Sequence, residues 1–224
     1  MTKKLIATLG ELLLIAAALL GLYLLYQVWF SNFHADLAAT EIATEIEREF
    51  SDPSSPATES APVIESTVDG TSEPKRAIGL LYIPKLKSDV WKTPIISDVS
   101  GRALSIGVGH YPMTALPGDP GNFAIAGHRA TNGEPFARFE RLAKGDLVYV
   151  QTKAGFFTYE LFENQKIQER EVWVLDSNPK GLADGVESLI TLTSCDPRWN
   201  STRRWAWWGK LVEFSTERPK ELNQ

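Results

Sequence analysis

The feature that most restricts the fold of this chain is an almost wholly apolar stretch over residues 5–30. Within it, residues 12–25 carry no charged side chain. A run of about 20 apolar residues is long enough to cross the hydrocarbon core of a bilayer, and lipid offers the backbone no hydrogen-bonding partner outside a helix. The stretch therefore predicts one membrane-spanning helix close to the N-terminus.

The residues around this stretch indicate how it is oriented. Lys3 and Lys4 precede it, so the positive-inside rule predicts a cytoplasmic N-terminus and an extracellular location for the rest of the chain. A cleaved signal peptide is the alternative interpretation. The apolar run is too long for a typical signal-peptide core, and no small-x-small cleavage site follows it. We therefore expect residues 1–35 to be a cytoplasmic N-terminus followed by an uncleaved signal anchor.

Residues 36–76 have the composition of an extracellular spacer. Ten acidic residues and a single base, Arg48, fall within residues 36–74. Residues 36–50 have apolar side chains at helical spacing and can continue the membrane helix outward. From residue 51 to about 74, Ser, Thr, Pro and Glu dominate and offer too little apolar surface to offset the chain entropy. We expect that part to be disordered.

From about residue 77 the pattern changes to short apolar runs separated by Gly- and Pro-rich turns. Seven or eight strands in a segment of this length are typical of a closed β-barrel or a β-sandwich. One short helix is expected over residues 136–142. Alternation in the last strand predicts Trp205 and Trp207 on one face and Trp208 on the other. The expected strands cover residues 79–83, 90–96, 122–127, 147–152, 155–166, 171–174, 189–194 and 205–214.

Cys195 is the only cysteine in the sequence, which excludes an intrachain disulfide and a cysteine-based metal cluster. We expect neither a metal nor a cofactor. A lone cysteine is either a small buried hydrophobe or a catalytic nucleophile. Cys195 ends an alternating run over residues 187–195 and stands next to the Asp196-Pro197 break. A thiol at the end of a strand is open to a groove, which favours the nucleophile.

Three histidines are available as partners for this thiol. His34 lies close to the predicted membrane surface. His110 lies in a segment that we expect to be a loop, and His128 ends the expected strand over residues 122–127. His128 is therefore the preferred candidate, although spacing alone does not establish a Cys–His pair.

Three segments of the chain, TLTSC (residues 191–195), GHYPMTALPGDPGNFAIAGHR (109–129) and YIPKL (82–86), resemble the sortase family, and most of all its class E members. Residues 191–195 (TLTSC) resemble the TLxTC signature of sortases, with Ser194 in place of the usual Thr. Residues 109–129 (GHYPMTALPGDPGNFAIAGHR) are similar to the class E segment that ends in the catalytic histidine, and residues 82–86 (YIPKL) resemble the first barrel strand. The resemblance covers about residues 77–215. It implies an all-β fold, a closed eight-stranded barrel with short helices.

The resemblance also implies the catalytic residues. Cys195 corresponds to the nucleophile and His128 to the general acid and base. In the class E pattern an arginine that opens the next strand falls nine residues after the cysteine, which selects Arg204 as the group that stabilises the oxyanion. Arg203 is the alternative if the loop has a different length. Unperturbed pKa values of about 8.5 for Cys and 6.5 for His imply that the charge-separated pair is a minor population at neutral pH.

Three further residues are expected to bind the substrate. In class E sortases a tyrosine in the loop before the histidine strand is associated with LAxTG signals instead of LPxTG, and Tyr111 lies at that place. A tyrosine that merely packs beside Pro112 is the alternative. Thr193 and Ser194 are expected to line the groove or to donate hydrogen bonds.

Together these features predict a single-pass cell-membrane sortase whose catalytic domain, residues 77–224, lies outside a Gram-positive cell. It is expected to cleave the Thr-Gly bond of a sorting signal and to transfer the peptide to an amine of the cell wall. The expected partners are sorting-signal peptides of secreted proteins, a peptidoglycan precursor amine and the membrane. The formal charge of −5 gives no indication of nucleic-acid binding.

Three alternative functions remain open at this point. The first is an extracellular cysteine peptidase that acts on cell-wall peptides. The second is a pilin-polymerising sortase, although the acidic segment contains no Asp-Pro-aromatic lid motif. The third is a membrane-tethered binding module with an inert thiol.

Overall fold

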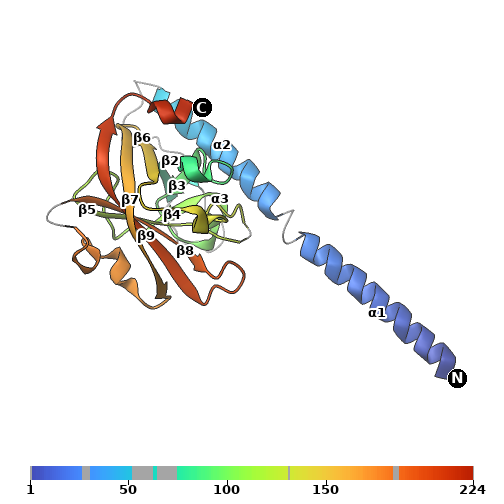
Figure 1. The fold of residues 1–224 in the computed structure, drawn as a ribbon. Helices are drawn as coiled ribbons and strands as arrows, with labels where there is room; N and C mark the ends of the chain where they lie inside the picture. Colours follow the sequence, from blue (N-terminus) through green and yellow to red (C-terminus); the bar gives the residue numbers. More distant parts are fainter. Residues whose placement is uncertain are drawn as a thin grey trace.

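The computed structural model describes residues 2–26, 31–51, 63–64, 75–130, 132–183 and 187–223. It shows a β-barrel with two successive helices at its N-terminal end (Figure 1). The helices are α1 (Thr2–Leu25), α2 (Ser31–Ser51) and α3 (Gly101–Ile106), with short 3-10 turns η2 (Pro84–Leu86), η3 (Phe139–Arg141), η4 (Val172–Leu175), η5 (Pro179–Gly181) and η6 (Lys220–Asn223). The strands are β1 (Val63–Ile64), β2 (Lys75–Tyr82), β3 (Thr93–Ile96), β4 (Val108–His110), β5 (Gly121–Ala126), β6 (Leu147–Thr152), β7 (Gly155–Gln168), β8 (Ser188–Asp196) and β9 (Arg203–Ser215).

The strands form one closed sheet, as expected. Their order is β1-β2-β3-β4-β5-β8-β9-β7-β6, and a further pairing of β2 with β6 closes the barrel. The two-residue strand β1 adds only an edge to β2. Pairs β3–β4 and β5–β8 are parallel, and the other pairs are antiparallel. Closure leaves few free edges, so the eight-stranded barrel is protected from edge-to-edge association.

The barrel core follows from alternation along the strands. Ile190 and Leu192 of β8 point inward and belong to the main apolar cluster, together with Trp207 of β9. Trp205 packs against the same cluster, whereas Trp208 belongs to a second cluster on the outer face. The predicted separation of Trp205 and Trp207 from Trp208 is therefore confirmed.

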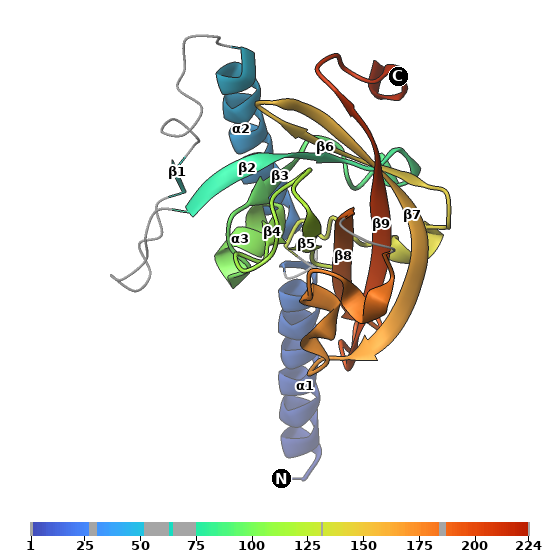
Figure 2. The ribbon, with the colours of Figure 1, turned by 90° about the vertical axis from the view of Figure 1, so that its left-hand side faces the viewer.

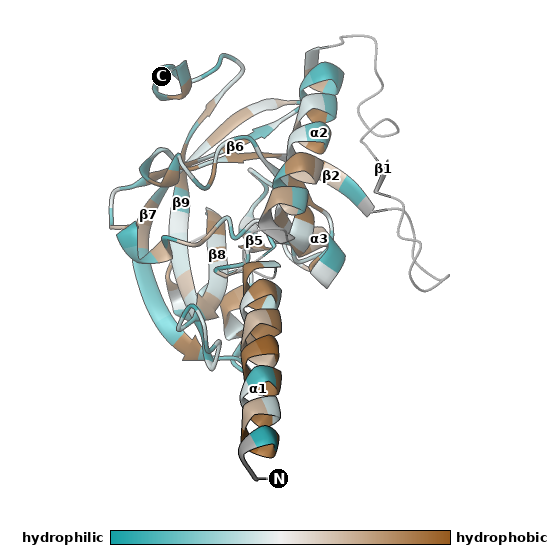
Figure 3. Ribbon diagram, turned by 90° about the vertical axis from the view of Figure 1, so that its right-hand side faces the viewer, coloured by the Kyte–Doolittle hydropathy of each residue, from teal (hydrophilic) through white to brown (hydrophobic). Residues whose placement is uncertain are grey.

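Helix α1 has the features of a membrane span. It contains a candidate span from Lys4 to Leu25, and every side chain in that range is exposed. It projects away from the barrel and is apolar along most of its length (Figures 1 and 3). A helix with apolar side chains all round is stable only when lipid or protein covers it. Among the described residues no protein surface covers it, which agrees with the predicted anchor.

Helix α2 is packed against the barrel, which the sequence analysis did not anticipate. The expected helical spacing over residues 36–50 is confirmed, but one face of the helix lies on β2, β3 and α3 (Figure 2). Ala43 and Ile46 are buried in an apolar cluster with Leu80 and Tyr82 of β2. Lys92, just before β3, donates to a Glu47 carboxylate oxygen at 2.8 Å. This part of the expected spacer is therefore an ordered element of the fold.

Two predictions of local structure were wrong. Residues 171–174 do not form a strand, because Val172–Leu175 is the 3-10 turn η4. The Glu171 carboxylate accepts hydrogen bonds from the Gln168 amide (2.7 Å) and from Nε1 of Trp173 (3.1 Å), which closes a local turn. The second error concerns residues 108–110, which form strand β4 instead of a loop.

The remaining expectations differ from the structure mainly in their bounds. The strand expected over residues 90–96 begins at Thr93, and the helix expected over residues 136–142 is the three-residue turn η3. The other expected strands lie within observed ones or overlap them closely. The disorder expected over residues 51–74 falls mostly outside the described residues, apart from Ser51 at the end of α2 and the two residues of β1.

Candidate active site

Cys195 lies near the C-terminal end of β8 with its side chain on the outer face of the barrel. It shares that face with Thr191 and Thr193, because alternate residues of a strand point the same way. Its neighbours Ser194 and Asp196 point to the other side and are buried, whereas Cys195 is partly exposed. The thiol is therefore accessible from outside the barrel, as the position at a strand end predicted.

Arg204 occupies the position of β9 that directly faces Cys195. Facing residues of an antiparallel pair place their side chains on the same face of the sheet. The Arg204 guanidinium forms an ion pair with Glu169 and donates to the Ser201 carbonyl at 3.1 Å. Arg203 instead faces Asp196, and both side chains lie on the inner face of the barrel. An Arg203 guanidinium nitrogen lies 3.5 Å from an Asp196 carboxylate oxygen. The register thus places Arg204, and not Arg203, beside the thiol.

His128 follows β5, which runs parallel to β8. The register pairs Ala126 with Thr193. Cys195 is two residues farther along β8, and His128 is two residues past Ala126, just beyond the end of β5. Both therefore come at the same end and on the same face of the β5–β8 pair. The backbone of the histidine segment is held by a hydrogen bond from the Phe136 amide to the His128 carbonyl at 2.9 Å.

Gly127, the residue before this histidine, has a steric reason to be glycine. A Cβ there would come within 2.6 Å of the Phe136 ring, which packs directly beneath it. The turn that delivers His128 to the outer face thus depends on the close approach of this aromatic side chain to the backbone.

Burial determines the protonation of this histidine. Desolvation lowers the pKa of His128 below its ordinary value, because a buried site disfavours the charged imidazolium. The ring is consequently neutral for most of the time at pH 7.

Tyr111 and Thr193 meet on the same outer face. The Tyr111 hydroxyl lies 3.3 Å from the Thr193 hydroxyl, which also donates to the Ile125 carbonyl at 3.1 Å. Ser194 faces inward and donates to the Gly127 carbonyl at 2.8 Å. Of the three expected substrate-binding residues, the structure brings Tyr111 and Thr193 to the outer face and uses the Ser194 hydroxyl to join β8 to the histidine segment.

His110 does not contribute to this face. It pairs with Ile125 and stacks on Phe123 inside the barrel, with ring centroids 5.1 Å apart. Its Nε2 lies 3.0 Å from the Ala115 carbonyl, an acceptor only, so Nε2 carries the proton and donates. Burial lowers the pKa of His110. The residue is a structural one in the core, whereas His128 follows the strand that pairs with the Cys195 strand.

A buried asparagine that the sequence analysis missed fastens a loop to this face of the barrel. Asn122 of β5 donates to the carbonyls of Val174 (2.9 Å) and Asp176 (3.0 Å), and it accepts from the Thr191 hydroxyl (2.6 Å). These bonds fasten the loop that contains η4 and η5 to the outer face of β5 and β8. Trp173 of that loop stacks on Trp208, with centroids 5.6 Å apart. The sequence gave no signal for this role, because an asparagine inside a strand pattern does not indicate which groups it will bind.

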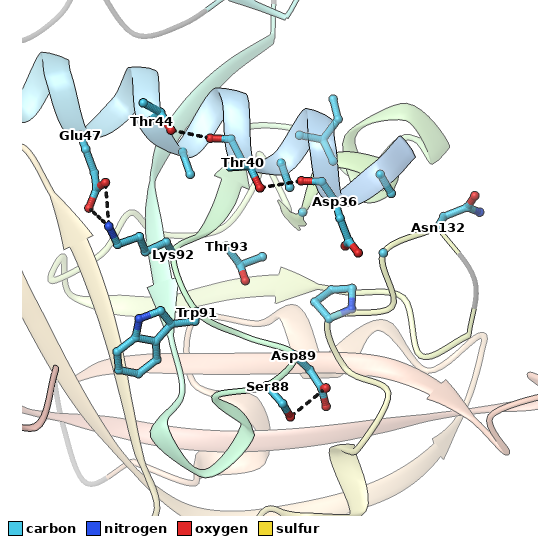
Figure 4. A pocket seen from close by; sticks show the side chains of 17 residues that line it. Asp36, Thr40, Thr44, Glu47, Ser88, Asp89, Trp91, Lys92, Thr93 and Asn132 are labelled. Carbon is cyan, nitrogen blue, oxygen red and sulfur yellow. Dashed lines mark hydrogen bonds and ion pairs between the residues drawn. The ribbon is translucent and has the colours of Figure 1, made fainter. Parts of the chain in front are cut away.

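A cavity of about 400 Å³ lies elsewhere, between α2 and the barrel (Figure 4). Asp36, Thr40 and Thr44 line it from the helix, and Trp91 and Lys92 line it from the barrel side. None of the candidate catalytic residues lines it. Within the described part of the chain, no group of three or more potential metal-ligating side chains is found.

The barrel and this arrangement of cysteine, histidine and arginine define a class of protein. The sortase domain model matches residues 81–212, and the chain belongs to the sortase family of cysteine transpeptidases. Its relatives include class E members. It is 35% identical to sortase SrtE1 of Streptomyces coelicolor over 220 residues, and 30% identical to sortase SrtE2 of the same organism over 234 residues.

Solved structures of sortase E are also similar to this chain. The structure of sortase E from Streptomyces avermitilis matches with a TM-score of 0.58 and 34% identity, covering 65% of this chain and 96% of that one. Sortase E1 from Streptomyces coelicolor, solved with a tripeptide in the active site, matches with a TM-score of 0.60 and 37% identity over the same shares.

The extent of the match differs between the relatives. The match to SrtE1 covers 94% of this chain but only 57% of SrtE1. The match to SrtE2 covers 97% of this chain and 88% of SrtE2. The similarity to SrtE1 thus concerns little more than half of that protein.

Proposed function

We propose that this chain is a membrane-anchored, class E-like sortase that cleaves the Thr-Gly bond of an LAxTG- or LPxTG-type sorting signal and transfers the acyl peptide to a cell-wall amine. The observation that carries the proposal is the facing pair Cys195–Arg204 with His128 beside it on one face of the barrel. A nucleophile, a proton-transfer group and a cation are what acyl transfer through a thioester needs.

The proposed reaction begins with attack of the Cys195 thiolate on the threonine carbonyl carbon. Negative charge then develops on the carbonyl oxygen, where the Arg204 guanidinium stabilises it. The C–N bond to glycine breaks, and the His128 imidazolium gives its proton to the departing amine. A thioester between the threonine acyl group and Cys195 results.

In the second half an incoming amine attacks this thioester. His128 takes the proton of the attacking nitrogen, the C–S bond breaks, and the thiolate is restored. Because burial lowers the pKa of His128, the imidazolium that must pair with the thiolate is a minor species at neutral pH. We therefore expect modest turnover at pH 7.

The location proposed for this chemistry is the outer surface of a Gram-positive cell. Lys3 and Lys4 in the first turn of α1 support a cytoplasmic N-terminus by the positive-inside rule. We propose residues 77–224 as the catalytic domain and residues 36–76 as the connection to the membrane, of which α2 is docked on the barrel. The clients would be secreted proteins with a sorting signal, and the acceptor a peptidoglycan precursor amine.

The test uses the full chain in detergent micelles with paired LAxTG and LPxTG peptides, with and without triglycine or a diamino acid as acceptor. Mass spectrometry follows the acyl adduct on Cys195 and the ligated product, and Cys195→Ala is the control. Adduct and ligation that are absent in the variant are the expected result. Hydrolysis without ligation would favour the peptidase alternative, and no adduct with either peptide would contradict the proposal.

A further inference from the structure

The two residues that follow the candidate catalytic pair form a buried ion pair with each other. Arg129 follows His128 in the sequence, and Asp196 follows Cys195. A terminal nitrogen of the Arg129 guanidinium, Nη1, lies 2.8 Å from Oδ1 of Asp196, and both side chains are more than nine-tenths buried. The same nitrogen donates to the Cys195 backbone carbonyl at 3.3 Å.

Further contacts hold each partner of this pair. The other terminal nitrogen of Arg129 lies 3.0 Å from a carboxylate oxygen of Glu140, and the guanidinium lies 5.3 Å from the centre of the Trp205 ring. Asp196 is also paired with Lys166 at 3.2 Å. Burial by itself raises the pKa of Asp196, but hydrogen bonds from Lys166 and Arg129 outweigh it and keep the pKa below its ordinary value. The carboxylate is therefore charged at neutral pH.

Alternation explains why this pair lies on the inner side of the barrel wall, behind Cys195 and His128. Cys195 points outward, so Asp196 points inward, and the inward Arg129 likewise leaves His128 on the outer face. The ladder between β5 and β8 ends nearby, with the Gly127 amide donating to the Thr193 carbonyl at 3.1 Å. Besides that bond and the Ser194 hydroxyl, two ion pairs join the segments: Arg129 with Asp196, directly beside the candidate catalytic residues, and Arg198 with Glu134, farther along both loops.

We propose that Arg129 and Asp196 form a clasp that sets the relative position of the His128 ring and the Cys195 thiol from inside the barrel. The proposal rests on the proposed function for the roles of those two residues. Arg129 and Asp196 touch neither substrate nor reacting atoms, so they are positioning residues. A planar guanidinium with several donors can hold the Asp196 carboxylate, the Cys195 carbonyl and Glu140 at once, which an ammonium group cannot do with the same geometry.

Isosteric neutral variants test the clasp in the full chain in detergent. Arg129→Met and Asp196→Asn are compared with Arg138→Met. Arg138 also lies in the chain segment after His128, but its ion pair is with Asp89 (3.0 Å) and does not involve β8. We expect Arg129→Met to lower kcat for ligation roughly 30- to 100-fold with KM nearly unchanged, because a small misplacement of reacting groups is costly. Arg129→Lys should restore about one tenth of the activity.

The double variant Arg129→Met/Asp196→Asn tests whether the two residues act through their mutual contact or independently. Because the two residues act through one contact, we expect it to lose no more activity than the worse single variant. Reaction of the thiol with iodoacetamide should change less than about threefold in Arg129→Met, since that reaction does not need His128 to be positioned. A kcat within about threefold of the original chain, or a loss that only follows the unfolded fraction, would overturn the proposal.

A second measurement does not depend on catalysis. Amide hydrogen exchange should accelerate about tenfold at Gly127, Phe136 and Ser201 in Arg129→Met, because both segments lose their common link. Arg138→Met should leave Gly127 and Ser201 unchanged. Exchange that stays the same at both segments would overturn the clasp even if no peptide were ligated. Absence of ligation in the original chain with faster exchange in the variant would count against the proposed function alone.

Discussion

Cys195 and Arg204 face each other across the antiparallel pair β8–β9 and share the outer face of the barrel. The neighbouring pair, Asp196 and Arg203, faces the other way. One strand register therefore assigns the two consecutive arginines to different surroundings, and this assignment leads to a direct test.

We predict that Arg204→Gln lowers kcat for ligation by about 10²- to 10³-fold, because it removes the cation at the developing oxyanion. Arg203→Gln is the matched control and should stay within about threefold, because its partner Asp196 keeps two other cations. Steady-state kinetics with one sorting peptide measure both. A larger loss in Arg203→Gln would contradict the assignment.

Tyr111 is predicted to influence which sorting signal is preferred. Tyr111→Ala should change the ratio of kcat/KM for LAxTG over LPxTG by about tenfold, because loss of the phenol ring leaves open space next to Thr193. Tyr111→Phe removes only the hydroxyl and separates its hydrogen bond from the ring. Competition between the two peptides, read by mass spectrometry, gives the ratio. An unchanged ratio in both variants would favour simple packing of the tyrosine.

Asn122 is predicted to hold the substrate-facing wall. Asn122→Ala removes two donors from buried carbonyls, so it should lower the free energy of unfolding by about 1–3 kcal/mol. We also expect KM to rise more than kcat falls, because the loop with η4 and η5 is no longer fastened. The exposed Asn223→Ala serves as the control in urea unfolding and in peptide kinetics. A stable variant with unchanged KM would refute this role.

The docking of α2 gives a prediction about stability. Ile46 is 1% exposed against the barrel, and Ile46→Ala should lower the free energy of unfolding by about 2–4 kcal/mol. Leu37 on the same helix is 53% exposed, and Leu37→Ala should change it by less than about 0.5 kcal/mol. Urea unfolding of the full chain in detergent, followed by tryptophan fluorescence, compares the two. Equal effects would mean that α2 is not held on the barrel.

Buried histidines predict how stability depends on pH. Burial lowers the pKa of His110 and His128 in the folded chain below the unfolded value of about 6.5. The unfolded chain then binds more protons, so stability is fully present above pH 6.5 and is lost as the pH falls towards the folded pKa values. Urea midpoints at pH 7.5 and 5.5 measure the loss.

His110→Phe separates the contribution of the core histidine. It keeps the stacking on Phe123 but removes one titrating group, so the fall in stability between pH 7.5 and 5.5 should become smaller. The reduction amounts to at most about 1.4 kcal/mol per unit of pKa shift. His128 should account for the slope that remains. An unchanged slope in His110→Phe would show that the residue titrates alike in both states.

Local pattern was sufficient for several features of this protein. The apolar stretch predicted α1, because a helix in lipid needs only length and composition. Alternation around Cys195 predicted a strand that delivers the thiol near its end, and it separated Trp205 and Trp207 from Trp208. These properties depend on residues close together in the chain, so the sequence by itself determined them.

Other features required the tertiary structure. Strand β4 has only three residues with a glycine in the middle, and it exists because β3 and β5 pair with it on either side. A Cβ at Gly109 would meet the Asp98 carbonyl at 2.3 Å, so the glycine reflects close packing and not a loop. His110 consequently faces the core.

For the candidate site, too, the sequence determined one part and the tertiary structure another. The candidate cysteine, histidine and arginine could be read from the sequence, and the family resemblance preferred Arg204 with Arg203 as the alternative. The register of β8 and β9 then showed that only Arg204 faces Cys195. The clasp of Arg129 and Asp196 and the docking of α2 join residues 67 positions apart and a helix to a distant sheet, respectively. Such contacts depend on how strands close into a barrel, and only the tertiary structure decided them, because a local pattern gives the direction of a side chain but not its partner.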